Sequence, residues 1–242
     1  VWCESPGSLT FEMQDIPAIA KAAHARGVKV LLDNTWASPL LCRPFELGVD
    51  VSVQAGTKYI VGHSDVMMGT ITTATEEDIL TIKKQIIISG DAIGPDDCYL
   101  AQRGLRTLGV RLKQHHDSGI KVAQWLETRP EVKRVLHPAL PDDPGHAIWK
   151  RDFSGASGLF SFVMEPVEKG QLANMVDHME LFGMGFSWGG FESLILPSDP
   201  TKIRTATNWD EDGRLIRLHV GLEDPDDLIA DLEAGFERLK TA

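Results

Sequence analysis

Two charged side chains stand where buried strands are predicted to end. Lys58 follows the apolar alternation Val51-Ser-Val-Gln-Ala55, which is typical of a short buried strand, and the chain then turns through Gly62. Asp33 ends a second apolar run, which follows a helical pattern. Because ligands of open α/β sheets bind outside the carboxyl ends of the strands, both side chains could face one crevice. A lone lysine in a turn is usually a solvated charge, but a nearby strand-end acid favours a chemical role.

The residues around Asp33 and Lys58 resemble the signature of one enzyme family. Asp33-Asn-Thr-Trp-Ala37 and the run from Asp50 to Ser64, with Ala55-Gly-Thr-Lys-Tyr-Ile at its centre, are similar to the pyridoxal-phosphate (PLP) enzymes of cysteine and methionine metabolism. The resemblance extends from Trp2 to about Leu239. It implies an α/β fold of the fold-type I PLP-dependent transferase class. The chain would then hold part of the large domain, with a mainly parallel sheet, and a small C-terminal α/β domain.

The resemblance implies a role in cofactor binding for three residues. A carboxylate beside the ring nitrogen keeps PLP protonated, and Asp33 would supply it, although strand-end aspartates commonly cap the following turn. Lys58 would bind the cofactor covalently and then act as general base and acid at the substrate's Cα. Thr57 would bind the cofactor phosphate. Ala55 stands where many members of the family have a further phosphate-binding serine.

An amino-acid substrate also needs a partner for its carboxylate, and a guanidinium binds a carboxylate in bidentate fashion. Arg217, in Leu215-Ile-Arg-Leu-His219, resembles the carboxylate-binding arginine of the family. Arg106 is the alternative, but we expect it to anchor the long helix that follows it. The competing role for Arg217 is a surface ion pair with the acidic group at 223–227, which we expect to cap the last helix.

Two tryptophans favour the carbon–sulfur β-lyase branch of the family. Trp36 stands where γ-lyases usually have phenylalanine, and Trp188 where γ-lyases and γ-synthases usually have leucine. The segments 137–141 and 149–162 also resemble bacterial β-lyases. By this resemblance Trp188 shapes the distal substrate pocket, and Ser187 hydrogen-bonds the substrate carboxylate or Lys58. The implied reaction cleaves L-cystathionine to homocysteine, pyruvate and ammonia, a step of methionine biosynthesis.

The resemblance also implies that the family's chain begins upstream of Val1. A glycine-containing phosphate loop, an aromatic residue that stacks on the cofactor and an arm that reaches the neighbouring subunit would belong to that part. We therefore expect a fragment of a homo-oligomer, a dimer of dimers, that acts as a β-lyase together with an N-terminal piece. A related γ-lyase or cysteine desulfhydrase is one alternative. A non-catalytic truncated chain is the other.

Composition and charge exclude several other classes of function. The 242 residues are 43% hydrophobic and 24% charged, with a net charge of −11, which argues against a nucleic-acid surface. No apolar run approaches the roughly 20 residues that span a membrane. Cys3, Cys42 and Cys98 have no metal or redox spacing and suit a reducing cytoplasm. The neighbours His115 and His116 would point to different faces of a helix, so we expect no metal site.

The periodicity of the apolar residues predicts two domains, 1–104 and 105–242. A capping Asp15 and a terminating Gly27 indicate a helix before the strand that ends at Asp33. Strand and helix patterns then alternate, which favours a largely parallel sheet. The further expected elements are helices at 39–48, 76–89, 105–129, 168–182 and 225–240, and strands at 51–55, 66–73, 132–136, 159–164, 193–196 and 215–220.

Overall fold

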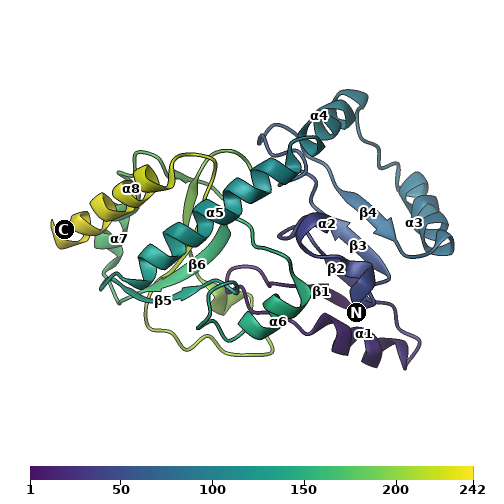
Figure 1. Ribbon diagram of the computed structural model, residues 1–242, viewed down its shortest axis with the longest axis horizontal. Helices are drawn as coiled ribbons and strands as arrows, with labels where there is room; N and C mark the ends of the chain where they lie inside the picture. Colours follow the sequence, from purple (N-terminus) through teal and green to yellow (C-terminus); the bar gives the residue numbers. More distant parts are fainter. Residues whose placement is uncertain (242) are drawn as a thin grey trace.

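The computed structural model describes residues 1–241, which form two sheets and the helices around them (Figure 1). The strands of the first sheet are β1 (Trp2–Glu4), β2 (Leu31–Asp33), β3 (Val51–Gln54) and β4 (Thr70–Thr73), in the order β1-β2-β3-β4. The first three pair in parallel, and β4 pairs antiparallel to β3. The prediction of a mainly parallel sheet is confirmed. The predicted strand at 66–73 is too long, because only its last four residues pair with β3.

Helix α1 (Ile16–His24) connects β1 to β2 and packs on the first sheet. The Asp15 side chain accepts a hydrogen bond from the Ala18 amide at 3.1 Å, so the predicted cap is confirmed. The helix buries Ile16 and Ala20 against Leu32 of β2 and neighbouring apolar residues. This packing fixes β2, and with it the position of Asp33 at the carboxyl edge of the sheet.

Three helices and one 3-10 turn complete the N-terminal part: α2 (Ser38–Leu41), the 3-10 turn η1 (Pro44–Leu47), α3 (Glu76–Ser89) and α4 (Pro95–Leu105). The single helix predicted at 39–48 is wrong. It breaks at Cys42, whose backbone is extended, because Pro44 disfavours a helical conformation at Arg43. Helix α3 has the predicted bounds, and α4 was not predicted.

The second sheet is mostly antiparallel. Its strands are β5 (Val132–Leu136), β6 (Leu159–Met164), β7 (Gly183–Met184), β8 (Leu194–Ser198) and β9 (Leu215–His219), in the order β5-β6-β9-β8-β7. Only β7 and β8 pair in parallel among these strands. The four longer strands were predicted, and β7 was not.

Helices α5 (Leu108–Glu127), α7 (Lys169–Val176) and α8 (Pro225–Arg238) pack on the second sheet. They bury a large apolar core, which includes Leu126, Phe160, Phe162, Met175, Ile216 and Phe236. Helix α6 (His146–Asp152) and the 3-10 turns η2 (Pro200–Lys202) and η3 (Leu239–Thr241) lie in the connections. Helix α5 extends from the end of α4 across to the second sheet (Figure 1). None of the described helices is long and apolar enough to cross a membrane.

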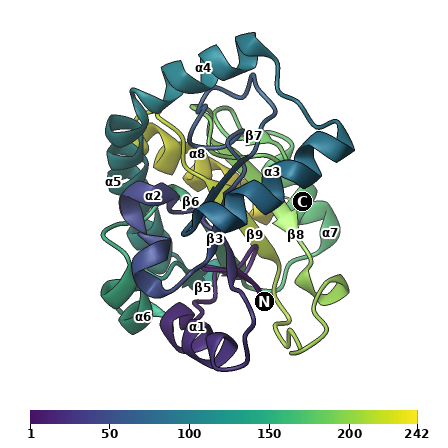
Figure 2. The same ribbon diagram turned by 90° about the vertical axis from the view of Figure 1, so that its right-hand side faces the viewer.

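A separate apolar cluster joins the two sheets. Phe11 and Trp36 come from the N-terminal part, and Phe153 and Leu159 come from the C-terminal part. The Trp36 indole donates a hydrogen bond to the Leu159 carbonyl at 2.8 Å. In the view of Figure 2 the strands of both sheets lie near the centre of the molecule with the helices around them. The buried cluster therefore packs the N-terminal and C-terminal parts of the chain against each other.

Candidate active site

Lys58 lies in a tight turn that follows β3, residues 55–62, which we call the lysine turn. The Lys58 amide donates to the Ala55 carbonyl at 3.0 Å, and the Gly62 amide donates to the Lys58 carbonyl at 2.8 Å. Gly62 has a φ of 73°, a conformation that glycine adopts without strain. Tyr59 and Val61 are buried beneath the turn. The turn therefore holds the Lys58 backbone rigidly while its side chain extends towards the C-terminal part.

The Lys58 amine contacts two of the predicted substrate-binding residues. Its Nζ donates a hydrogen bond to Ser187 Oγ at 2.7 Å and lies 5.2 Å from the ring centroid of Trp188. Burial lowers the pKa of Lys58, and the positive charge of Arg217 lowers this pKa further. A larger share of the amine is therefore neutral than at a solvated lysine, and only the neutral amine can act as nucleophile or base.

Arg217 occupies the middle of β9 and is buried. Its Nη2 donates to the Phe186 carbonyl at 2.7 Å, and the guanidinium carbon lies 5.8 Å from the centroid of the Phe186 ring. No carboxylate within residues 1–241 forms an ion pair with Arg217, so the competing surface ion pair is absent from the described structure. The acidic group instead binds Ser193 through Glu223 and caps α8 through Asp224.

Asp33 is the last residue of β2, and Thr57 lies in the turn that follows β3. Asp33 Oδ1 accepts hydrogen bonds from the Thr35 amide at 2.9 Å and the Thr35 hydroxyl at 2.5 Å, so it caps its own turn. The Thr35 hydroxyl accepts in turn from the Ala55 amide at 2.9 Å. The Thr57 hydroxyl accepts from the Met68 amide at 2.8 Å and donates to the Met68 carbonyl at 3.2 Å.

The structure thus brings four of the predicted residues together. Lys58, Ser187 and Trp188 are in direct contact, and Arg217 is close enough to lower the Lys58 pKa. In the described part of the chain, no hydrogen bond or ion pair links Asp33 or Thr57 to this group. The hydrogen bond from the Ala55 amide to the Thr35 hydroxyl joins the turn after Asp33 to the turn that contains Thr57 and Lys58.

Arg111, which was not predicted, anchors the lysine turn. Its guanidinium donates to the carbonyls of Gly104 at 2.8 Å and Ile60 at 3.3 Å. A Cβ built on Gly62 would lie 2.1 Å from Arg111 Nη1, so the turn and the guanidinium are in close contact. The expectation that Arg106 anchors the long helix is wrong, because Arg106 is exposed at the end of α4. The available indication was the position of Arg111 on the buried face of α5, next to Leu112.

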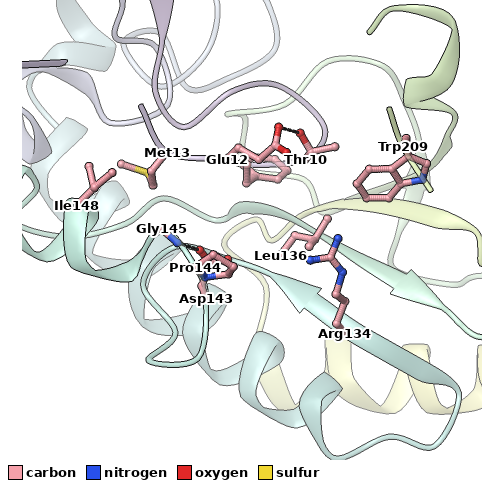
Figure 3. Close-up of a pocket in the computed structure, with 11 residues that line it drawn as sticks. Thr10, Glu12, Met13, Arg134, Leu136, Asp143, Pro144, Gly145, Ile148 and Trp209 are labelled. Atoms are coloured by element: carbon pink, nitrogen blue, oxygen red, sulfur yellow. Dashed lines mark hydrogen bonds between the residues drawn. The ribbon is translucent and has the colours of Figure 1, made fainter. Parts of the chain in front are cut away.

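The pocket drawn in Figure 3 lies away from these residues. It is bounded by residues 10–13, by β5 and by the segment 143–148, with Trp209 at one end. Arg134 stands over the Trp209 ring there and pairs with Glu211 at 2.9 Å. Neither Lys58 nor Arg217 lines this pocket.

The side chains around Lys58 have the chemistry that PLP requires. A partly neutral amine could bind the aldehyde carbon of the cofactor, and the Asp33 carboxylate could face its ring nitrogen. Asp33 Oδ2 has no hydrogen-bond partner within residues 1–241, so one oxygen remains for such a contact. Beside the amine, a Cβ built on Gly189 would lie 2.9 Å from the Lys58 Cα, and this glycine lets the backbone approach the lysine closely. The residues present therefore fit the cofactor.

Comparison with known proteins also finds a family of PLP-dependent enzymes, and the match covers almost the whole chain. The family model described as Cys/Met metabolism PLP-dependent enzyme matches residues 1–237. Cystathionine beta-lyase MetC of Escherichia coli (strain K12) is 50% identical over 99% of this chain and 62% of its own length. The L-alanine/L-glutamate racemase of Wolbachia pipientis wMel is 47% identical over 99% of this chain and 60% of its own length.

A solved structure supports the fold independently. Cystathionine gamma synthase from Xanthomonas oryzae pv. oryzae, in complex with aminoacrylate and cysteine, superposes with a TM-score of 0.92 at 33% identity, over 100% of this chain and 63% of that one. The chain thus spans about 62% of the length of the E. coli relative. From the family match, the lysine turn and the superposition together, the chain belongs to the PLP-dependent enzymes of cysteine and methionine metabolism.

Proposed function

We propose that this chain carries the lysine and substrate-carboxylate part of a carbon–sulfur β-lyase that cleaves L-cystathionine. The observation that carries the proposal is the Lys58 amine, with its lowered pKa, hydrogen-bonded to Ser187 and placed against Trp188. An aromatic wall at Trp188 favours the β-lyase over the γ-lyases and γ-synthases, where leucine is usual. The identity with a cystathionine β-lyase supports the same substrate.

In this proposal each residue has one chemical task. PLP, when bound, supplies a ring that accepts the electron pair left at the substrate's Cα. Lys58 would hold the cofactor through its amine and, when that amine is free, would remove the Cα proton of the substrate. Arg217 binds the substrate carboxylate through its guanidinium. Ser187 accepts a hydrogen bond from the Lys58 amine and so directs it.

The proton that Lys58 takes from Cα can be returned at the leaving group. The Cβ–S bond breaks, and protonated Lys58 gives its proton to the homocysteine thiolate. The three-carbon product adds water and loses ammonia, which yields pyruvate. In sum, cystathionine and water give homocysteine, pyruvate and ammonia. Asp33 would face the ring nitrogen, and Thr57 would bind the phosphate in place of its present contacts with Met68.

Racemisation is a second candidate function, because one relative at 47% identity is an amino-acid racemase. The first step is the same, since Lys58 would remove the Cα proton, but a proton would then return to Cα from the opposite face. No bond to sulfur would break. A racemase would also need a proton donor on the face opposite to Lys58. Both candidates use Lys58 as the base at Cα, so the products separate them.

The complete enzyme would work in the cytoplasm as a homo-oligomer, a dimer of dimers, with small amino acids as substrates. Exposed apolar side chains on consecutive helices support an assembly of subunits. They are Ile87 and Ile88 of α3, each 68% exposed, Tyr99 of α4, 66% exposed, and Val110 of α5, 71% exposed. Three free cysteines, Cys3, Cys42 and Cys98, support a reducing compartment.

Product analysis tests the proposal. The enzyme is incubated with PLP and L-cystathionine, and the products are separated by chromatography. A β-lyase releases pyruvate and homocysteine, whereas a γ-lyase releases cysteine and 2-oxobutyrate. A parallel incubation with L-alanine, followed by chiral chromatography, detects a racemase. D-alanine without pyruvate would replace the lyase by the racemase, and 2-oxobutyrate would replace it by the γ-lyase.

A further inference from the structure

A glycine pair presses against the lysine turn. Gly189 and Gly190 are both buried, and Gly189 has a φ of 85°. A Cβ built on Gly189 would lie 2.9 Å from the Lys58 Cα, and one built on Gly190 would lie 2.2 Å from Ser64 Oγ. Only glycine permits an approach this close at position 189, where the neighbouring atoms are the Lys58 backbone, whereas at position 190 they are the ends of the Ser64 and Glu192 side chains. The backbone of the pair is therefore seated directly on the turn that carries Lys58.

His219 holds the pair from the opposite side. It is the last residue of β9 and is 1% exposed. Its Nε2 lies 3.2 Å from the Gly189 amide and 3.1 Å from the Gly190 carbonyl. In either neutral tautomer Nε2 makes one of these hydrogen bonds, because it either accepts from Gly189 or donates to Gly190.

The surroundings of His219 keep its ring neutral and fixed. Burial and the neighbouring His115 lower the pKa of His219 to about 3, with smaller contributions from Arg217 and Lys58. The ring centroid lies 5.2 Å from that of His115 and 5.9 Å from that of Tyr59. A ring packed in this way cannot turn without moving its neighbours.

Two residues of β9 thus form hydrogen bonds with the two ends of one segment, residues 186–190. Arg217 and His219 are two apart, so their side chains lie on the same face of the strand. Arg217 binds the Phe186 carbonyl at 2.7 Å, and His219 binds the glycine pair. Ser187 and Trp188, which contact the Lys58 amine, lie between these two hydrogen-bonded ends.

We propose that His219 is a positioning residue that seats the segment Ser187–Gly190 on the lysine turn and so sets the environment of the Lys58 amine. The proposal rests on the proposed function for the importance of that amine, but it concerns only this chain's own contacts. Without the hydrogen bond from His219 to the glycine pair, Ser187 and Trp188 would move away from the Lys58 amine, and water would reach Nζ. The amine would then behave as an ordinary lysine, with Arg217 as the remaining charge that faces it.

The test measures how the acylation rate of the Lys58 amine depends on pH in the cofactor-free protein. Trace acylation with acetic anhydride over a range of pH, followed by mass spectrometry of the Lys58 peptide, gives the midpoint of its pH–rate curve. His219→Leu should move this midpoint up towards the value of a solvated lysine. Each unit of increase lowers the neutral fraction of the amine about tenfold at neutral pH. His219→Gln keeps a polar group that can reach the glycine pair and should restore the original midpoint.

His137→Leu is the matched control. His137 is also fully buried, but its hydrogen bond goes to the Ala139 amide in its own loop, at 3.2 Å. This variant should leave the Lys58 midpoint unchanged while it lowers stability in the same way. An unchanged midpoint in His219→Leu, or an equal shift in His137→Leu, would overturn the proposal.

If circular dichroism shows that His219→Leu does not fold, His219→Asn replaces it, since its shorter amide cannot reach the glycine pair and should give the same upward shift. Acylation does not depend on PLP. A failure of Lys58 to bind PLP would therefore sink the proposed function alone, and a fixed midpoint would sink the positioning role alone.

Discussion

At the scale of the residue, the chemistry of Lys58 depends on what surrounds its amine. Burial and the charge of Arg217 lower its pKa, and Ser187 Oγ accepts its hydrogen bond at 2.7 Å. The same burial lowers the pKa of Arg217, which lacks a carboxylate partner in the described chain. A substrate carboxylate would pair with this guanidinium, because an opposite charge nearby favours the charged form.

Replacing the lysine tests the proposed base. Lys58→Ala should reduce pyruvate formation from cystathionine by about a thousandfold or more, because general acid–base catalysis by a positioned group contributes factors of this order. Steady-state rates from a coupled pyruvate assay provide the measurement. Lys83→Ala, which removes an exposed lysine of α3, is the control and should retain the original rate. Normal turnover by Lys58→Ala would contradict the assignment.

Replacing the arginine tests substrate binding. Arg217→Ala should raise KM by roughly thirtyfold, which corresponds to about 2 kcal/mol, the lower end of the cost of breaking a buried charged pair. Arg217→Lys keeps the charge but loses the planar fork, so it should recover only part of the loss. Arg106→Ala removes the exposed alternative and should leave KM unchanged. If Arg106→Ala raised KM and Arg217→Ala did not, the carboxylate site would have to be reassigned.

At the scale of the element, helix α4 supports the lysine turn. Gly104 lies in its last turn, and a Cβ there would meet the Val61 carbonyl at 2.3 Å and the Ile60 carbonyl at 2.5 Å. Arg111 of α5 closes the same contact by donating to the Gly104 and Ile60 carbonyls. The turn is therefore in contact with two helices, α4 and α5, and also with the glycine pair Gly189–Gly190.

The close contact at Gly104 predicts a loss of stability. Gly104→Ala should lower the free energy of unfolding by about 1–3 kcal/mol, the usual cost of overpacking a well-packed contact. Urea denaturation followed by circular dichroism gives the value. Gly109→Ala in α5 is the control, because its Cβ would meet only Leu40, at 3.9 Å. It should be neutral or slightly stabilising. Equal effects of the two substitutions would mean that α4 is free to move away from the turn.

The elements were predictable where an apolar period extends over enough residues. Helix α3 has Ile79, Ile82 and Ile86 at helical spacing, and β6 is a nearly continuous apolar run, whereas β1 and β7 have only three and two residues. Helix α4 was missed because it is rich in polar residues, which include Asp96, Asp97, Gln102 and Arg103. The site residues Lys58, Ser187 and Arg217 followed from a family resemblance. Arg111 and His219 did not, because their roles depend on contacts between distant segments, which no local pattern encodes.

At the scale of the whole molecule, three buried histidines connect stability to pH. Burial is the main cause that lowers the pKa of His115 to about 4, and of His137 and His219 to about 3. In the unfolded chain each would titrate near 6.5. These residues are therefore neutral in the folded protein and charged in the unfolded chain once the pH falls below about 6.5.

Stability should consequently fall as the solution is acidified. The contribution of the histidines is complete above pH 6.5 and is lost as the pH falls towards their folded-state values. Each histidine contributes a slope of up to about 1.4 kcal/mol per pH unit in this range. Urea denaturation at pH 7, 6 and 5 measures the slope, and His137→Gln should reduce it by the share of one histidine. A constant free energy of unfolding between pH 7 and 5 would contradict the neutral state of these residues.

The two sheets come together so that the lysine turn of the first faces β9 of the second, and we propose that PLP binds there through Lys58. Reduction with borohydride after incubation with PLP, followed by peptide mapping, tests it most directly. We expect a phosphopyridoxyl group on Lys58 that is absent from the Lys58→Ala variant. Modification confined to exposed lysines such as Lys83 and Lys84, with none on Lys58, would contradict it.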